Sequence, residues 1–344
     1  MAEGAVREAF ISQAAICARL GSPFTARLCK VLADLDGDTA IARRILGWRG
    51  DPAADKDNVP LRLCGGLHGL VRAGRAPDLA TLYPPASSPD EPALKTEVAK
   101  VLATQHDWLD PWLEQAPQTN EVGRSALLMA GLAEIAGRFP LPIQLFELGA
   151  SAGLNLQLDR FGYDLGGRAF GDPRSSVQLS PDWRGRPPRE AEVRINHRAG
   201  CDINPMDPAR DGERLLAYIW PDQPERLERT AAALKLARSH PVPIAKADAA
   251  NWIERQLDPS LAIGVTRVIL HSIAFQYFPG PAQARIRAHI AAAGAGATEE
   301  APVAWLRFEW LPGEPSASLR LRTWPGEERL LAWAHPHGSD VTWL

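Results

Sequence analysis

Hydrophobic residues recur at helical spacing in the first part of the chain. From Val6 to about Gly137 they return at the period of an amphipathic helix, as at Leu28, Leu32 and Leu35. Glycines, prolines and residues that favour helix caps divide this stretch into about six predicted helices. We expect Gly21-Ser22-Pro23 to open one helix, Asp38 or Thr39 to cap another, residues 84–92 to form a loop, and Thr119 or Asn120 to cap the last helix.

The pattern changes at Leu141-Pro142. Beyond this point, short runs typical of β-strands alternate with helical or polar stretches: IQLFEL, EVRINHRAG, PVPIAKAD, TRVILHS, VAWLRFEW, SLRLRTW and ERLLAWA. The early runs are far enough apart for helical crossovers, whereas the last three are close together. The pattern predicts a helical N-terminal domain over residues 1–137. It also predicts an α/β domain over residues 138–344, with a mainly parallel sheet that ends in an antiparallel edge.

Composition narrows the class of protein. The 344 residues are 45% hydrophobic and 23% charged, with a formal net charge of −3, so no nucleic-acid partner is indicated. The four cysteines have no C-x-x-C spacing, which favours reduced thiols over a disulfide framework or a zinc site. No apolar stretch is typical of a signal peptide or a membrane span. We therefore expect a cytoplasmic protein with no membrane partner.

The segment after the first predicted strand carries the candidate chemistry. Glu147 ends that strand, and Gly149 and Gly153 follow before an expected amphipathic helix. Glycines let the backbone turn sharply and approach a ligand closely, and a helix start directs free N–H groups into the crevice. A nicotinamide or flavin site would normally show G-x-G-x-x-G, but Ser151 stands in place of the second glycine.

The same segment also matches the nucleophile elbow of α/β-hydrolases. Gly149-x-Ser151-x-Gly153 has the G-x-S-x-G spelling and the strand-to-helix context. A serine hydrolase would use Ser151 with Asp248 and His271. Several strands precede the elbow in those enzymes, whereas the residues before Leu141 are predicted to be helical. A hydrolase is therefore an alternative hypothesis, and a non-catalytic protein that binds a nucleoside cofactor is another.

Four segments in order resemble the strand ends of Rossmann-like methyltransferases. In that superfamily an acid two positions before the first glycine helps to hold the methionine portion of S-adenosylmethionine, and Glu147 stands there. A later acid accepts hydrogen bonds from the ribose diol, for which two carboxylate oxygens are well suited. The resemblance implies cofactor binding by Glu147, Gly149, Ser151, Gly153, Asn155, Asp202 (ribose) and Asp248 (adenine), with His271 as the catalytic base.

The spacing departs from a compact unit of this kind. Asp202 lies 53 residues after Gly149, whereas a ribose acid is expected about 20 residues on. We expect an insertion at residues 161–190 that forms a hairpin or a cover loop. Asp164, 15 residues after Gly149, is a competing ribose ligand. Asp202 is preferred because it follows a convincing strand.

Polar residues ahead of the first strand are candidates for acceptor binding. They are Gln118, Asn120, Glu121 and Arg124, on or before a helix expected to run beside the crevice. The simpler interpretation is a helix cap with Glu121 in the first turn. Trp183 and Trp220 are candidates for a substrate pocket. His335 and His337 flank a proline without a nearby cysteine or acidic cluster, so no metal site is predicted.

Over most of its length the chain resembles a bacterial family of unknown function with a methyltransferase-like fold. The resemblance is carried by residues 118–121, 147–155, 200–207, 220–222, 271–272 and 336–338. It implies a Rossmann-like fold and S-adenosylmethionine as cofactor, but it names no substrate. The resulting hypothesis is an S-adenosylmethionine-dependent methyltransferase that acts on an unidentified small-molecule acceptor.

Overall fold

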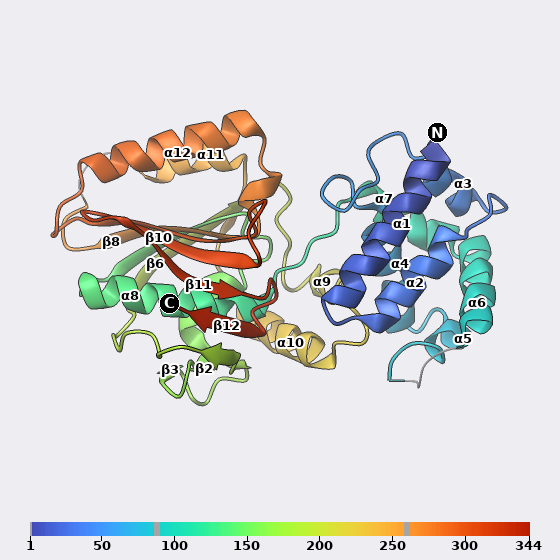
Figure 1. Ribbon diagram of the computed structural model, residues 1–344, viewed down its shortest axis with the longest axis horizontal. Helices are drawn as coiled ribbons and strands as arrows, with labels where there is room; N and C mark the ends of the chain where they lie inside the picture. The colour runs from blue at the N-terminus through green and yellow to red at the C-terminus, as the bar shows by residue number, and fades with distance from the viewer. Residues whose placement is uncertain (1, 86–89, 258–261) are drawn as a thin grey trace. The chain divides into compact units, whose positions relative to one another are not determined.

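The chain forms two compact units. The computed structural model describes residues 2–85, 90–257 and 262–344 (Figure 1). The helical unit comprises residues 1–119 and 211–228, and the sheet unit comprises residues 120–210 and 229–344. The division falls at residue 119 instead of the expected 137, because the helix at Ser125–Arg138 packs in the sheet unit.

The predicted helical character of the N-terminal region is confirmed. The helices of this unit are α1 (Ala2–Arg19), α2 (Pro23–Ala33), α3 (Ala40–Leu46), α4 (Val59–Arg72), α5 (Pro77–Ala80), α6 (Glu91–Thr104), α7 (His106–Glu114) and α9 (Gly212–Ala217). The Ser22 side chain accepts a hydrogen bond from the Thr25 N–H, and Thr39 caps α3 in the same way. These are two of the predicted caps. Residues 86–89 of the predicted loop lie outside the described residues.

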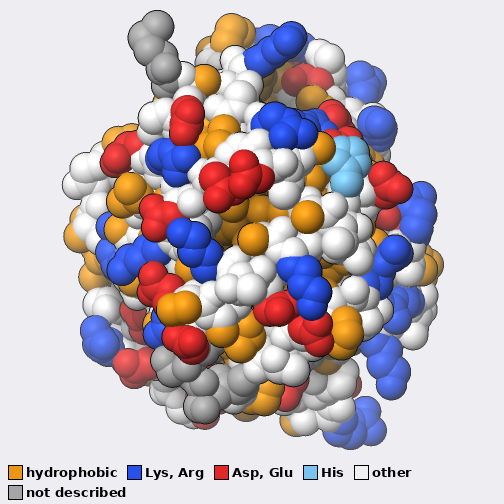
Figure 2. Space-filling model, turned by 90° about the vertical axis from the view of Figure 1, so that its right-hand side faces the viewer, with side chains coloured by type: hydrophobic (Ala, Val, Ile, Leu, Met, Phe, Trp, Pro, Cys, Tyr) orange, Lys and Arg blue, Asp and Glu red, His pale blue; other side chains and the backbone are white. Residues whose placement is uncertain are grey.

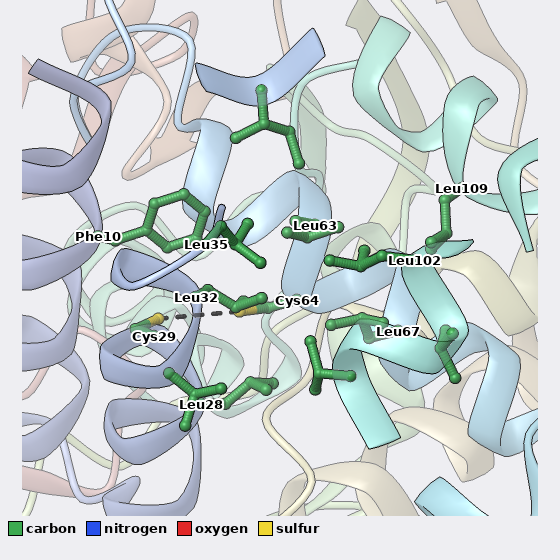
Figure 3. Packing of buried hydrophobic residues seen from close by; sticks show 14 of the residues in the cluster. Phe10, Leu28, Cys29, Leu32, Leu35, Leu63, Cys64, Leu67, Leu102 and Leu109 are labelled. Carbon is green, nitrogen blue, oxygen red and sulfur yellow. Dashed lines mark hydrogen bonds between the residues drawn. The ribbon is translucent and has the colours of Figure 1, made fainter. Parts of the chain in front are cut away.

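The core of the helical unit is made of leucines, small aliphatic residues and two cysteines. Phe10, Leu32, Leu63 and Leu67 are among its fully buried side chains (Figure 3). Helix α9 comes late in the chain but packs against α4, where a Cβ on Gly65 would lie 2.5 Å from the Tyr218 ring. Helix α10 (Pro224–Ser239) begins in this unit and continues into the sheet unit.

Surface charge agrees with the balanced composition. On the face shown in Figure 2, acidic and basic side chains are interspersed over the middle and the left, whereas Lys and Arg side chains predominate along the right-hand edge. Within the part of the chain that the structure describes, no helix is long and apolar enough to cross a membrane.

A nine-stranded sheet organises the second unit, in the order β5-β12-β11-β10-β9-β8-β1-β6-β7. The neighbours from β7 to β9 pair in parallel, whereas β9, β10, β11 and β12 form an antiparallel meander. The expected mixed sheet is thus confirmed. Its strands are β1 (Ile143–Leu148), β5 (Asp182–Arg184), β6 (Ile195–Asp202), β7 (Ile244–Lys246), β8 (Thr266–Ser272), β9 (Val303–Glu309), β10 (Ala317–Trp324), β11 (Glu328–Ala334) and β12 (Asp340–Trp343).

Helices cover both faces of the parallel part of this sheet (Figure 1). Helices α11 (Ala249–Gln256) and α12 (Gly280–Ala295) pack on one face through Ile253 and Ile286, against Phe146 and Trp305. Helix α8 (Ser125–Arg138) lies on the other face, where a Cβ on Gly131 would come within 2.6 Å of Leu306. Apolar side chains on both faces explain why the central strands are continuous hydrophobic runs.

The segment between β1 and β6 differs from the expectation. The amphipathic helix predicted after the glycine loop is a short 3-10 helix, η2 (Asn155–Arg160). The predicted insertion at residues 161–190 contains β5 and a separate three-stranded sheet of β2 (Gly162–Asp164), β3 (Ala169–Gly171) and β4 (Gln178–Leu179). The crossover therefore presents no long helix at the end of β1.

Candidate functional site

The order of the strands places a topological switch point at the carboxyl end of β1. From β1 the chain proceeds to β6 and β7 on one side, and then to β8 and β9 on the other. Open α/β sheets bind ligands where the strand order reverses in this way, just beyond the strands. The loop after β1, from Gly149 to Gly153, and the loop after β8, from Ile273 to Phe275, flank this point.

The two glycines of the β1 loop are required by its backbone and by its neighbours. Gly149 and Gly153 have φ values of +73° and +69°. A Cβ on Gly149 would lie 2.6 Å from the Ala274 Cβ, and one on Gly153 would lie 2.8 Å from the Ile244 Cδ1. The loops after β1 and β8 are therefore in direct contact, which only glycine allows at position 149.

Glu147 is a buried acid at the end of β1. Its side chain is 1% exposed, and its Oε2 has no hydrogen-bond partner among the described residues. Burial raises the pKa of Glu147 to about 8; the Asn155 amide opposes this shift, and the Asp202 carboxylate adds to it. A carboxyl group with an unused oxygen in this position is ready to receive a cationic or hydrogen-bond-donating ligand group.

Asp202 stands beside the same loop, at the end of β6. Its Oδ2 accepts a hydrogen bond from the Ser151 N–H at 2.9 Å, and its Oδ1 accepts one from the Asn204 N–H at 2.8 Å. Each carboxylate oxygen can accept more than one hydrogen bond. Asp202 therefore holds the β1 loop in place, and the structure brings it close to Glu147 as predicted.

Two asparagines fasten the β1 loop from the opposite side. The Asn120 Oδ1 accepts a hydrogen bond from the Leu154 N–H at 2.9 Å, and the Asn155 Oδ1 accepts one from the Ser125 hydroxyl at 2.8 Å. Asn120 does not cap α8, which begins at Ser125 after the short 3-10 turn η1 (Val122–Arg124). Asn155 is fully buried, and its Nδ2 makes no hydrogen bond of normal geometry within the described chain, although the amide is near enough to Glu147 to favour the ionised acid.

His271 and Glu309 form a buried pair near the end of β8. The His271 Nδ1 lies 2.5 Å from the Glu309 Oε1, and this oxygen also accepts hydrogen bonds from the Ala274 and Phe275 N–H groups. The His271 ring stacks on Phe275 with 4.8 Å between centroids. Its Nε2 is buried and has no partner in the described residues. Glu309 thus orients His271 and shapes the loop that contacts Gly149.

A family model matches this chain over residues 7–343. The chain belongs to DUF2332. The family is described as an uncharacterized protein conserved in bacteria. Comparison with curated proteins and with solved structures gives no match.

The acceptor candidates of this DUF2332 chain are divided between the units. Gln118 belongs to the helical unit, whereas Asn120, Glu121 and Arg124 belong to the sheet unit. The Arg124 guanidinium donates to the carbonyl oxygens of Ser272 and Pro336, at 2.8 and 2.9 Å. Glu121 accepts from the Gly123 N–H at 2.9 Å and lies 3.5 Å from the Arg229 guanidinium. These contacts join the carboxyl end of β8 to the C-terminal segment.

The remaining candidates lie in other surroundings. Asp248 caps α11, because its Oδ1 accepts a hydrogen bond from the Asn251 N–H at 2.9 Å. The Asp164 Oδ1 accepts from the Gly167 N–H in a turn of the small sheet. Trp183 stacks on Trp343, and Trp220 lies in the helical unit. No cluster of three or more potential metal ligands occurs in the described ranges.

Sequence reasoning missed Glu309 because its partners are distant in the chain. Its carboxylate meets residues that come 34 to 38 positions earlier. The pairing of β8 with β9, in which Ser272 lies opposite Phe308, brings them together. The available signal was an acid at the end of a largely apolar strand.

Proposed function

We propose that the sheet unit binds S-adenosylmethionine and transfers its methyl group to a small acceptor molecule. The observation that carries the proposal is the Glu147 carboxyl, buried at the topological switch point with one oxygen lacking a partner among the described residues. The amino acid portion of S-adenosylmethionine bears an ammonium group. An ammonium beside this oxygen would both donate a hydrogen bond and stabilise the ionised acid.

Asp202 supports the proposal from the neighbouring strand. Its two oxygens are held in fixed positions by the Ser151 and Asn204 N–H groups. A vicinal diol could donate to both oxygens while these contacts persist. Asp248 would serve the adenine from the end of β7, provided that its capping hydrogen bond to Asn251 is kept.

The bound cofactor supplies an electrophilic methyl group, so the chain has to align the acceptor and remove its proton. His271 is the proposed base. The Glu309 carboxylate binds the Nδ1 of His271, so Nε2 is the ring nitrogen that would accept the proton. Arg124 fixes the end of β8 through the Ser272 carbonyl and thereby positions His271.

Calorimetric titration with S-adenosylmethionine and its demethylated product tests the proposal, with NADH as a control ligand. Asp202→Asn retains the shape of the side chain and should weaken binding roughly tenfold to a hundredfold. Asp164→Asn is the matched control and should leave affinity unchanged, because Asp164 holds a turn in the small sheet. Absence of binding by the folded wild-type protein would refute the cofactor assignment.

Proton release gives a second, independent test. At pH 7 an acid with a pKa of about 8 is mostly protonated, and a bound ammonium would ionise it. Titrations in buffers of different ionisation enthalpy should therefore show close to one proton released for each cofactor bound. Glu147→Gln should abolish that release. Binding that releases the same proton from the variant would exclude Glu147 as the ammonium ligand.

The geometry of Ser151 supports a serine hydrolase as the second candidate function. Its φ is +52°, as a tight turn after a strand requires, and its buried Oγ has no partner among the described residues. The predicted acid, Asp248, caps α11, so Glu309 would have to take its place as the partner of His271. A fluorophosphonate that labels wild-type protein but not Ser151→Ala would favour the hydrolase. A non-catalytic binding protein would instead bind the cofactor at the β1 loop but lack an ordered acceptor pocket.

A further inference from the structure

Three of the four cysteines lie buried in the helical unit, two of them in its main core and Cys17 in a smaller cluster. Cys17 on α1, Cys29 on α2 and Cys64 on α4 are all buried, whereas Cys201 lies in the sheet unit. The Sγ atoms of Cys29 and Cys64 are 3.8 Å apart (Figure 3). Hydrogen bonds with Cys17 and then Cys64 raise the pKa of Cys29 well above its usual range, so Cys29 interacts with both other thiols.

The Sγ atoms of Cys29 and Cys64 are in van der Waals contact, within reach of a disulfide bond after a modest movement. A disulfide has a sulfur–sulfur length of about 2.05 Å, so the two Sγ atoms need to approach by less than 2 Å. Helices α2 and α4 pack directly against each other, and both sulfurs point into their shared core (Figure 3). A disulfide would require the two side chains to rotate toward each other, with any further movement taken up by the helices.

A small cavity reaches one of these sulfurs. It is lined by Cys64 together with Thr25, Leu28, Leu61 and His68, and it offers about 10 Å³ to the centre of a water-sized molecule. That is room for about one water. Cys64 is 6% exposed and Cys29 is 0% exposed. Only a very small oxidant can approach, and it meets Cys64 first.

We propose that Cys29 and Cys64 form an oxidation site, which closes a disulfide between α2 and α4 on reaction with hydrogen peroxide. The Cys64 sulfur attacks one peroxide oxygen, the O–O bond breaks and water leaves, which gives a sulfenic acid. The Cys29 sulfur then attacks the Cys64 sulfur, the S–O bond breaks and a second water leaves. Two thiols lose two electrons and two protons, and the peroxide gains them.

Mass spectrometry tests this site on the full-length protein. Wild-type protein is treated with hydrogen peroxide, denatured, alkylated with N-ethylmaleimide and digested without reductant. We expect two of the four thiols to escape alkylation and one cross-linked peptide pair to join Cys29 to Cys64. Dithiothreitol should restore all four alkylated thiols.

Single variants assign the pair. Cys64→Ser should abolish the cross-link, while Cys201→Ser, the control in the sheet unit, and Cys17→Ser should both retain it. A cross-link between Cys17 and Cys29, a Cys64 sulfinic acid without a cross-link, or four freely alkylated thiols after peroxide would each overturn the proposal. If Cys64→Ser fails to fold, the peptide map of the wild-type protein decides alone.

Discussion

Neutral Glu147 should make the stability of the sheet unit depend on pH in a defined direction. Burial raises its pKa from 4.5 to about 8, so the folded protein holds this proton more tightly than the unfolded chain does. The stability that the neutral acid contributes is fully present below about pH 4.5, and it is lost as the pH rises to about 8. Glu147→Gln removes the ionisation while keeping a neutral side chain of similar shape.

The expected magnitude follows from the shift. One pKa unit corresponds to about 1.4 kcal/mol, so the wild-type protein should lose roughly 3 kcal/mol relative to Glu147→Gln between pH 5 and pH 8. Other titrating groups are shared by both proteins and cancel in the difference. The stability of the variant relative to the wild type should therefore rise by this amount from pH 5 to pH 8.

Urea titrations at several pH values measure this difference. The readout should be hydrogen exchange at β1 amides, because the 11 tryptophans of the chain report on both units together. Glu299→Gln is the matched control, since that side chain is 62% exposed in the same unit, and its stability difference from the wild type should stay constant with pH. If the wild-type and Glu147→Gln stabilities stay parallel from pH 5 to 8, Glu147 is already ionised in the folded protein and the reasoning fails.

Two further substitutions test the contact between the β1 and β8 loops. Gly149→Ala should lower the free energy of unfolding by about 3 kcal/mol, because it adds a Cβ against Ala274 at a positive φ. Gly167→Ala, at φ +84° in open space, should lose only about 1 kcal/mol in the same urea titration, and equal losses would contradict the steric argument. Glu309→Ala removes the acceptor shared by His271 and the Ala274 and Phe275 N–H groups, and it should destabilise by about 3 kcal/mol with faster exchange at the Ala274 amide. Glu309→Gln keeps an acceptor oxygen, so an effect as large as that of alanine would count against this role.

Most of the long strands could be predicted from the sequence because they are apolar runs, such as β1 and β8, or alternate apolar with polar residues, such as β10. All seven predicted runs contain a strand, including the short β7 at Ile244–Lys246. Strands β5 and β12 were not predicted, because they are short and pair with each other at the edge of the sheet. The sequence of η2 predicted an amphipathic α-helix, because the apolar positions of a 3-10 turn have nearly the same spacing as those in the first turns of an α-helix.

The candidate site was predictable only in part. Glu147, Gly149 and Asp202 end or follow strands, so their common edge follows from parallel pairing alone. The roles of Asn120 and Arg124 were not accessible, because each side chain reaches a backbone group far along the chain, in the β1 loop and at Ser272. Such contacts depend on the packing of α8 against the sheet, which local periodicity does not encode.

The helical unit is assembled from two pieces of chain, and this constrains the order in which the protein can be made. During synthesis α1 to α7 leave the ribosome first, but Tyr218, which packs over Gly65, follows only after β1 to β6. Until then α4 has an uncovered apolar surface at Gly65. A fragment that ends at Thr119 would keep that surface exposed permanently, so the helical unit should be expressed with residues 211–228 supplied, for example through a circular permutation.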